Sequence, residues 1–241
     1  MPSIPTTRRA RAVSSKPLDL TYYEVAAEKS LAARLMHSAR LRMFYDFLNL
    51  ASPTPRDTIL DVGVSDAEHA SDNMLERLYP WRERITGAGL ADGASFLRAH
   101  PQCAYLPIST GEQLPARDGQ FDLVVSNAVI EHVGGSRRQQ AFVRELIRVA
   151  RRGVFLSMPN RYFPVEHHTA LPLVAWSDAT FRLACRLTGK AYWGDVDHLR
   201  LMSPARLREI LPMEVAPIIR HAGIRLGPWS SNLVVWLPKT E

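Results

Sequence analysis

A short segment of the chain concentrates side chains that can move a proton. Glu166, His167 and His168 follow one another directly, and we treat all three as candidate catalytic residues. A neutral imidazole can take a proton from an O–H or N–H group near neutral pH. The alternative is that one of these histidines only hydrogen-bonds the backbone and shapes the loop. Three adjacent residues cannot supply a full coordination sphere without distant ligands, so we predict no metal site.

A second segment, Phe121–Val133, reads FDLVVSNAVIEHV and predicts a ligand-binding edge. Its apolar run, preceded by Gly119 and followed by polar residues, favours a strand buried on both faces. Ser126 and Asn127 then lie at the carboxyl edge of a sheet, where open α/β sheets bind ligands. Residues 128–133 look like the start of the next helix.

Residues 121–133 resemble the fourth motif of class I S-adenosylmethionine-dependent methyltransferases, in the small-molecule group with an SN-x-x-x-EHV string. Residues 114–119, with their Leu-Pro and Asp-Gly pairs, also fit the usual lead-in of that group. The resemblance implies that S-adenosylmethionine is the cofactor and that Asn127 and His132 contact it. The plainer interpretation is an ordinary buried strand followed by a helix.

The first strand, residues 58–63, resembles the first motif of the same family. Its tight backbone lets N–H groups approach the carboxylate of the methionine part, while the acid helps to hold the ammonium group. Asp61 and Gly63 match the motif, whereas polar residues replace its later glycines. The cofactor-binding residues implied here are Asp61, Gly63, Val64 and Ser65.

Two further cofactor contacts depart from the usual family pattern. Gly89 stands where relatives place the acid that binds the ribose, so Asp92 is the substitute candidate. The alternative role for Asp92 is a helix N-cap. Relatives often place an aspartate after the third strand for the adenine amino group, whereas this chain has Thr110, Gly111 and Glu112, which are the candidate adenine contacts.

Residues 159–169 resemble a PNRWFP-x-E-x-H loop of the same subgroup. This loop leaves the fifth strand, residues 154–158, at the carboxyl edge beside the expected methyl donor. His168 matches the family position best, and the resemblance therefore favours it as the residue that acts on the acceptor.

The elements that must position these residues form an α/β fold. We expect a three-layer sandwich with a Rossmann-like, mainly parallel seven-stranded sheet and an antiparallel last strand. Residues 1–20 are expected to be a disordered basic tail rather than a transit peptide, and residues 21–56 a helical cap. The methyltransferase domain spans 57–241, with a helical lid inserted at about 163–202. A helix from about Arg137 to Ala150 is expected to end in the cations and glycine of 151–153.

Composition narrows the function further. The chain has 241 residues, 46% of them hydrophobic, and a net charge of +6 that is spread out without a nucleic-acid-binding signature. No apolar run reaches the length of about 18 residues that a membrane span needs. Cys103 and Cys185 form no metal or redox spacing, and a cytoplasmic protein is the simplest expectation.

We therefore expect a methyltransferase acting on a small-molecule or lipid-like acceptor, by O-, N- or C-methylation. The apolar segment 170–188 is interpreted as a lid over that acceptor, while a dimer surface or a membrane contact are the alternatives; the protein is then a monomer or a homodimer. The rival class is a methyltransferase-fold binding protein that has lost catalysis, suggested by Gly89 and Thr110 at positions where acids are usual.

Overall fold

The computed structural model describes residues 31–66 and 73–239; the predicted basic tail and the first part of the predicted cap lie outside this range. The α-helices are α1 (Leu31–Ala51), α2 (Met74–Leu78), α3 (Ala94–Ala99), α4 (Ser136–Val149), α5 (Asp178–Leu187) and α6 (Pro204–Ile210). The short 3₁₀ turns are η2 (Arg82–Arg84), η3 (Ile130–His132) and η4 (Ala191–Gly194). Among the described helices, none combines the length and the apolar character needed to cross a membrane.

The strands form one seven-stranded sheet in the order β3-β2-β1-β4-β5-β7-β6. They are β1 (Ile59–Val62), β2 (Ile85–Gly89), β3 (Ala104–Pro107), β4 (Phe121–Asn127), β5 (Ala150–Pro159), β6 (Ile218–Leu226) and β7 (Trp229–Pro238). β1 to β5 pair in parallel, and β7 lies antiparallel between β5 and β6. The predicted Rossmann-like sheet with an antiparallel last strand is confirmed.

Two hydrophobic clusters on opposite faces of the sheet make this a three-layer fold. Alternate residues of β4 serve the two faces: Val124 packs with α4 and α6, whereas Leu123 and Val125 pack with α1, α2 and α3. Because both faces of β4 are covered, almost every residue in it is buried. This burial on both faces explains why the sequence of β4 is a continuous apolar run.

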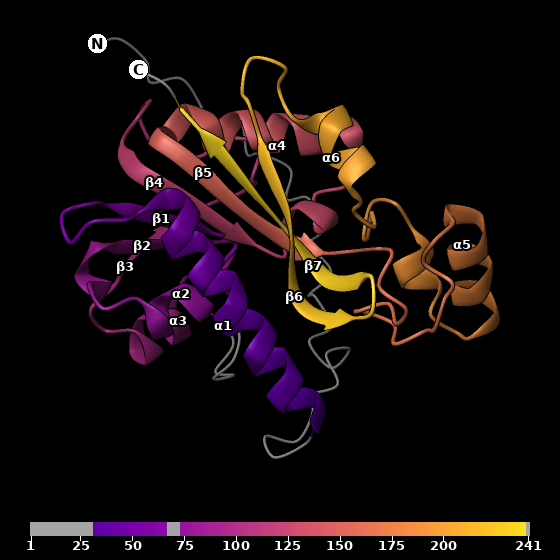
Figure 1. Cartoon of the computed structure of the whole chain (residues 1–241). Coiled ribbons are helices and arrows are strands. Elements are labelled where there is room, and N and C mark those ends of the chain that lie inside the picture. Colours follow the sequence, from indigo (N-terminus) through magenta and orange to yellow (C-terminus); the bar gives the residue numbers. More distant parts are fainter. Residues whose placement is uncertain (1–30, 67–72, 240–241) are drawn as a thin grey trace, which may run out of the picture.

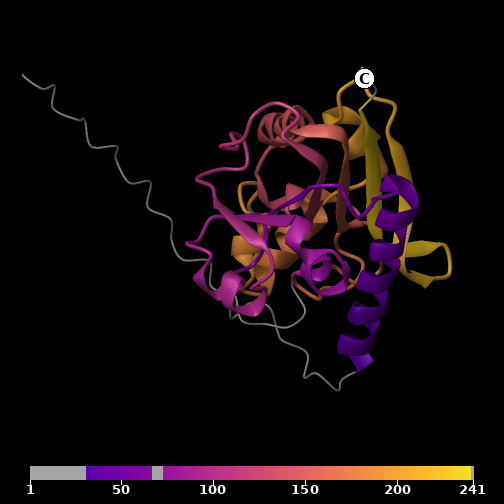
Figure 2. The ribbon, with the colours of Figure 1, turned by 90° about the vertical axis from the view of Figure 1, so that its left-hand side faces the viewer.

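The C-terminal half of α1 packs on the sheet. Met43, Phe44 and Phe47 are buried, while Leu35 in the first half is 41% exposed. Phe47 meets the ring of Phe155 in β5 edge to face at 5.5 Å, and Figures 1 and 2 show the helix running alongside β6 and β7. The described part of the predicted cap thus covers the sheet face near its last strands.

The segment between β5 and α6 forms a small unit of its own, with α5 standing away from the sheet in Figure 1. Its core joins α5 to η4 and to residues 199–201; the buried members are Ala175, Phe181, Cys185, Trp193, Leu199 and Leu201. Ser203 accepts a hydrogen bond from the backbone N–H of Arg206 and so caps α6, with Pro204 at its first position.

Two local predictions are wrong. Residues 128–133 do not begin the next helix; Ala128 has a left-handed φ of +53°, and only the single turn η3 follows. Residues 151–153 do not end a helix either, because β5 already begins at Ala150. Gly153 lies within β5, where a Cβ would stand 2.4 Å from the Trp236 ring, so close packing rather than a helix cap requires the glycine.

Candidate active site

The candidate cofactor site lies at the carboxyl ends of β1 and β4. The strand order reverses between these two neighbours, because β1 leads to β2 on one side and β4 leads to β5 on the other. Such a switch point is where open α/β sheets bind ligands. A cavity of about 20 Å³, enough for about one water, lies there and is lined by residues that include Asp61, Gly63, Val64, Asn73 and Asn127.

Gly63 adopts a backbone conformation that disfavours a side chain. Its φ is +96°, and a Cβ built there would lie 2.2 Å from the Cγ2 atom of Val129. The backbone N–H groups of Gly63 and Val64 both donate to the carbonyl of Ala88, at 2.8 and 3.1 Å. The turn after β1 is therefore tied to the end of β2.

Two other predicted cofactor residues are held by side-chain amides and hydroxyls. Ser65 donates its backbone N–H to Asn73 Oδ1 at 2.9 Å, and Asn73 Nδ2 donates back to the Ser65 carbonyl at 2.8 Å. Asn127, at the end of β4, accepts a bond of 2.5 Å from Ser157 Oγ. Asn73 was not predicted; its side chain defines one wall of the cavity.

A pair of buried acids stands beside this cavity. Asp61 at the end of β1 is 7% exposed, and Glu76 in α2 is fully buried. Burial raises the pKa of Glu76 to about 7. Burial also raises the pKa of Asp61, and the charge of Glu76 raises it further. Neither carboxylate oxygen of Glu76 has a hydrogen-bond partner within the described part of the chain. The sequence did not single out Glu76, since it appears there as one polar residue in a short helix.

The predicted ribose contact is altered at the end of β2. A Cβ on Gly89 would lie 2.6 Å from the hydroxyl oxygen of Tyr105, so the tyrosine fills the place of the usual acidic side chain. Asp92 accepts a bond of 3.0 Å from the N–H of Ala94 and thereby supports the start of α3. Gly93, with φ +78°, is the N-cap residue itself.

The predicted adenine contacts lie beyond the end of β3. Thr110 forms an isolated antiparallel bridge with Gln113. Gly111 packs against the ring of Phe142 in α4, where a Cβ would come within 2.7 Å. Glu112 faces Arg138 across 3.6 Å, and both side chains are largely exposed. The segment therefore has a tight backbone contact on one side and an exposed carboxylate on the other.

In the loop after β5, the Glu166 carboxylate holds His168 in place. Its side chain is 2% exposed and accepts bonds from His168 Nδ1 at 2.8 Å and from the Thr169 N–H and hydroxyl at 2.7 Å each. Burial would raise the pKa of Glu166, but the bonds from His168 and Thr169 outweigh it and lower that pKa to about 2. Glu166 is thus an ionised orienting group, whereas His167 is exposed.

The structure brings His132 and His168 together from segments far apart in the chain. Their Nε2 atoms are 3.1 Å apart. His132 Nδ1 donates to the backbone carbonyl of His198 at 2.9 Å. Burial, and to a lesser extent the charge of His168, lowers the pKa of His132 to about 4. His132, predicted as a cofactor contact, therefore belongs to the same cluster as the predicted acceptor residue His168.

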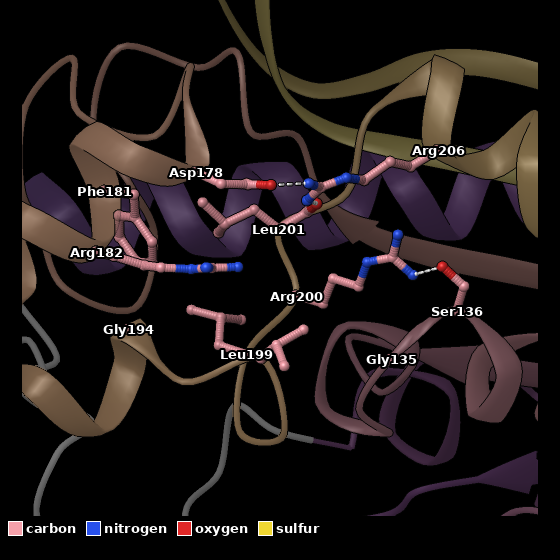
Figure 3. Close-up of a pocket in the computed structure, with 11 residues that line it drawn as sticks. Gly135, Ser136, Asp178, Phe181, Arg182, Gly194, Leu199, Arg200, Leu201 and Arg206 are labelled. Carbon is pink, nitrogen blue, oxygen red and sulfur yellow. Dashed lines mark hydrogen bonds and ion pairs between the residues drawn. The ribbon is translucent and has the colours of Figure 1, made fainter.

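A pocket of about 290 Å³ lies between the start of α4 and the segment around α5 and η4 (Figure 3). One wall is the start of α4 at Gly135 and Ser136, and the other is the segment around α5 and η4. Gly194 lines the pocket, and its neighbour Trp193 packs on the ring of His168 at 5.2 Å. The remaining lining combines apolar and charged side chains; these are Phe181, Val196, Leu199, Leu201, Asp178, Arg182, Arg200 and Arg206.

The three arginines of the pocket differ in how they are paired. Arg206 forms an ion pair with Asp178, and Arg200 donates to Ser136 and Gln139. Arg182 points from α5 into the pocket in Figure 3 and has no hydrogen bond or ion pair with the described residues. Sequence reasoning missed this pocket because its walls come from α4, α5 and residues 194–206, which show no common motif.

Comparison with known proteins matches residues 60–158 to a family model described as a methyltransferase domain. No curated protein sequence matches. Among solved structures, magnesium protoporphyrin IX methyltransferase from Synechocystis PCC 6803, solved with bound SAH, is 14% identical, with a TM-score of 0.55 over 86% of this chain and 85% of that one.

Two further solved structures share the fold. N-methyltransferase NodS from Bradyrhizobium japonicum WM9 is 14% identical, with a TM-score of 0.53 over 89% of this chain and 100% of that one. A possible histamine N-methyltransferase from Thermotoga maritima is 15% identical, with a TM-score of 0.51 over 86% of this chain and 92% of that one. At such low identity these likenesses concern the fold alone.

Proposed function

Since residues 60–158 form a class I S-adenosylmethionine-dependent methyltransferase domain, we propose that this protein methylates a small-molecule acceptor that carries an anionic group. The observation that carries the proposal is the pocket between α4 and α5, whose lining residue Gly194 follows Trp193, the residue that packs on the ring of His168. Apolar side chains and arginines line it together, a combination that suits an acceptor with an apolar body and a carboxylate or phosphate.

The residues beside β1 fit the methionine end of S-adenosylmethionine. Gly63 forms the tight, left-handed turn after β1 that lines the cavity, and the buried carboxyl groups of Asp61 and Glu76 suit an ammonium group. Asn127 lines the same cavity. The cofactor supplies an electrophilic methyl group on its sulfonium. The ribose end is less clearly matched, because Tyr105 fills the space beside Gly89.

Transfer requires a nucleophilic atom of the acceptor to approach the methyl carbon in line as the carbon–sulfur bond breaks. The protein then contributes alignment and the exclusion of water rather than a covalent intermediate. His168 is the proposed acceptor-side residue, and Glu166 positions it. His168 Nε2 lies 3.1 Å from His132 Nε2, so we expect the acceptor to contact both imidazole rings rather than His168 alone.

The first experiment measures donor binding. Titration calorimetry with S-adenosylmethionine and its demethylated product tests whether the altered ribose site still binds the cofactor. A donor-turnover screen then compares acceptors in matched pairs, each carboxylate or phosphate against its neutral ester or amide. Turnover confined to the anionic members supports the proposal. Equal turnover of the neutral members contradicts the anionic class, and loss of all donor binding favours the non-catalytic binding protein.

The inserted segment is proposed as a lid over this acceptor. Phe181 lines the pocket, whereas Leu173, Leu183 and Leu187 are 59%, 57% and 78% exposed. Activity should therefore fall in Phe181→Ser and survive in Leu187→Ser if the segment acts as a lid. A concentration-dependent mass in light scattering would instead indicate a homodimer, and sedimentation with liposomes a membrane contact.

A further inference from the structure

We propose that Glu131, His132 and His168 form a binding site for one divalent transition-metal ion. Each residue offers one ligand atom, and these atoms all lie within 4.8 Å of one another. Glu131 and His132 come from η3 after β4, and His168 comes from the loop after β5. Residues 166–168 alone lack the distant ligands that a metal site needs; the fold supplies two of them, Glu131 and His132.

The spacing of the two imidazoles suits a shared metal. Nitrogens bound to zinc at about 2.0–2.1 Å in tetrahedral geometry stand roughly 3.4 Å apart. The Nε2 atoms of His132 and His168 are 3.1 Å apart, and their rings meet edge to face. A small opening of the pair by a few tenths of an ångström would admit the ion.

The hydrogen bonds of the two rings leave both Nε2 lone pairs pointing at each other. Nδ1 of His132 must donate, because its partner is the carbonyl oxygen of His198. Nδ1 of His168 must also donate, because its partner is the Glu166 carboxylate. In the neutral ring each Nε2 is then an acceptor. Two acceptors at 3.1 Å repel, so either a proton or a metal ion must lie between them.

The Glu131 carboxylate supports a metal ion independently of the two histidines. Its side chain is 1% exposed, and neither carboxylate oxygen has a hydrogen-bond partner among the described residues. A buried carboxylate without a partner is costly, whereas coordination to a cation compensates its charge. The carboxylate lies close to the two imidazoles. One cation there would compensate the charge of Glu131 and also bind the two facing Nε2 lone pairs.

The surroundings match the outer shell of a metal centre. Metal-bound histidines usually donate their other ring N–H to a carboxylate or a backbone carbonyl, and His168 and His132 do so to Glu166 and His198. Trp193 packs on both rings, at 5.2 Å from His168 and 6.1 Å from His132. Hydrogen bonds to Glu166 and His198 therefore fix the orientation of the two imidazoles, and the Trp193 ring covers them on one side.

The ligand set selects the class of metal. Two imidazoles and one carboxylate suit zinc or a neighbouring first-row metal rather than magnesium or calcium, which prefer oxygen ligands. Three protein ligands leave at least one coordination position open, as in catalytic rather than structural zinc sites. If the proposed methyl transfer is right, an acceptor oxygen at that position would be polarised and deprotonated more easily.

Metal binding itself provides the test, independent of turnover. Untagged full-length protein is stripped with a chelator and dialysed, then titrated with Zn²⁺ by calorimetry and with Co²⁺ by visible absorption. We expect one equivalent of either metal and the d–d bands of Co²⁺ in a four- or five-coordinate site with nitrogen and oxygen ligands. His132→Gln and Glu131→Gln should abolish saturable binding. Glu166→Gln should weaken it by about 10–100-fold, the usual effect of losing an outer-shell partner.

The exposed His167 supplies the matched control, since His167→Ala should bind metal as the wild type does. Absence of a saturable equivalent in the wild type overturns the proposal and leaves a proton shared between the two rings; that result does not depend on whether any variant folds. Unchanged binding in a folded His132→Gln protein also overturns it. Donor calorimetry on the same preparation is a separate measurement, so the metal proposal and the methyltransferase proposal can fail independently.

Discussion

The buried carboxyl groups of Asp61 and Glu76 repel each other beside the cavity at the end of β1. Burial is the larger cause of the raised pKa at both groups, and the charge of Glu76 adds to it at Asp61. The folded protein binds a proton at Glu76 more tightly than the unfolded chain does, so its stability must depend on pH.

The free energy of unfolding should fall as the pH rises from about 4.5, the ordinary pKa, to about 7, the raised one. In that window the folded state holds the proton that the unfolded chain has released, and above it the buried charge destabilises the fold by about 3 kcal/mol. Urea denaturation of the wild type and Glu76→Gln at pH 4.5 and 8 measures this. The free energy of unfolding of Glu76→Gln should fall less between these two pH values than that of the wild type. An equal fall in both proteins would contradict the assignment of this pH dependence to Glu76.

Gly63→Ala should weaken donor binding and destabilise the fold. An alanine at φ +96° carries backbone strain of about 1–3 kcal/mol, and its Cβ collides with Val129. The double variant Gly63→Ala/Val129→Ala removes the collision, and Val129→Ala alone is its control. Calorimetry on the folded double variant should still show weaker donor binding. Donor affinity equal to that of Val129→Ala would mean that the cofactor does not approach Gly63.

Asp92 can be assigned by two substitutions that separate its possible roles. The structure favours support of α3, because Asp92 Oδ1 accepts from the N–H of Ala94. Asp92→Ala should then lower stability by about 1 kcal/mol, while Asp92→Asn keeps an acceptor and should be nearly neutral. Donor affinity should change in neither. A drop of about 1–3 kcal/mol in donor binding for both variants would instead establish the ribose contact.

Arg182→Met should raise KM for an anionic acceptor without changing donor affinity. Arg182 points into the pocket without a partner among the described residues. Loss of a hydrogen bond to a charged group costs about 1.5–3 kcal/mol, which corresponds to roughly 10–100-fold in KM. Arg186→Met, one turn further along α5 and exposed, is the matched control. Equal KM values for the two variants would exclude Arg182 from acceptor recognition.

The sequence by itself determined the sheet and the edge at which the candidate site lies. The continuous apolar run of β4 requires cover on both faces, and the polar Ser126 and Asn127 after it mark the carboxyl edge. These are local signals, because one strand carries its own burial pattern. The local errors have the same origin: the glycine at 153 resembles a helix end in sequence, whereas Trp236, distant along the chain, decides its role.

Only the tertiary structure decided which polar side chains meet. The loop after β5 places His168 against His132, which lies 36 residues earlier, and no spacing rule connects residues in different loops. Likewise Tyr105 occupies the space beside Gly89, and α2 buries Glu76 near Asp61. Contacts of this kind depend on how neighbouring strands bring their carboxyl ends to one edge, so they follow from the packed fold rather than from any single segment.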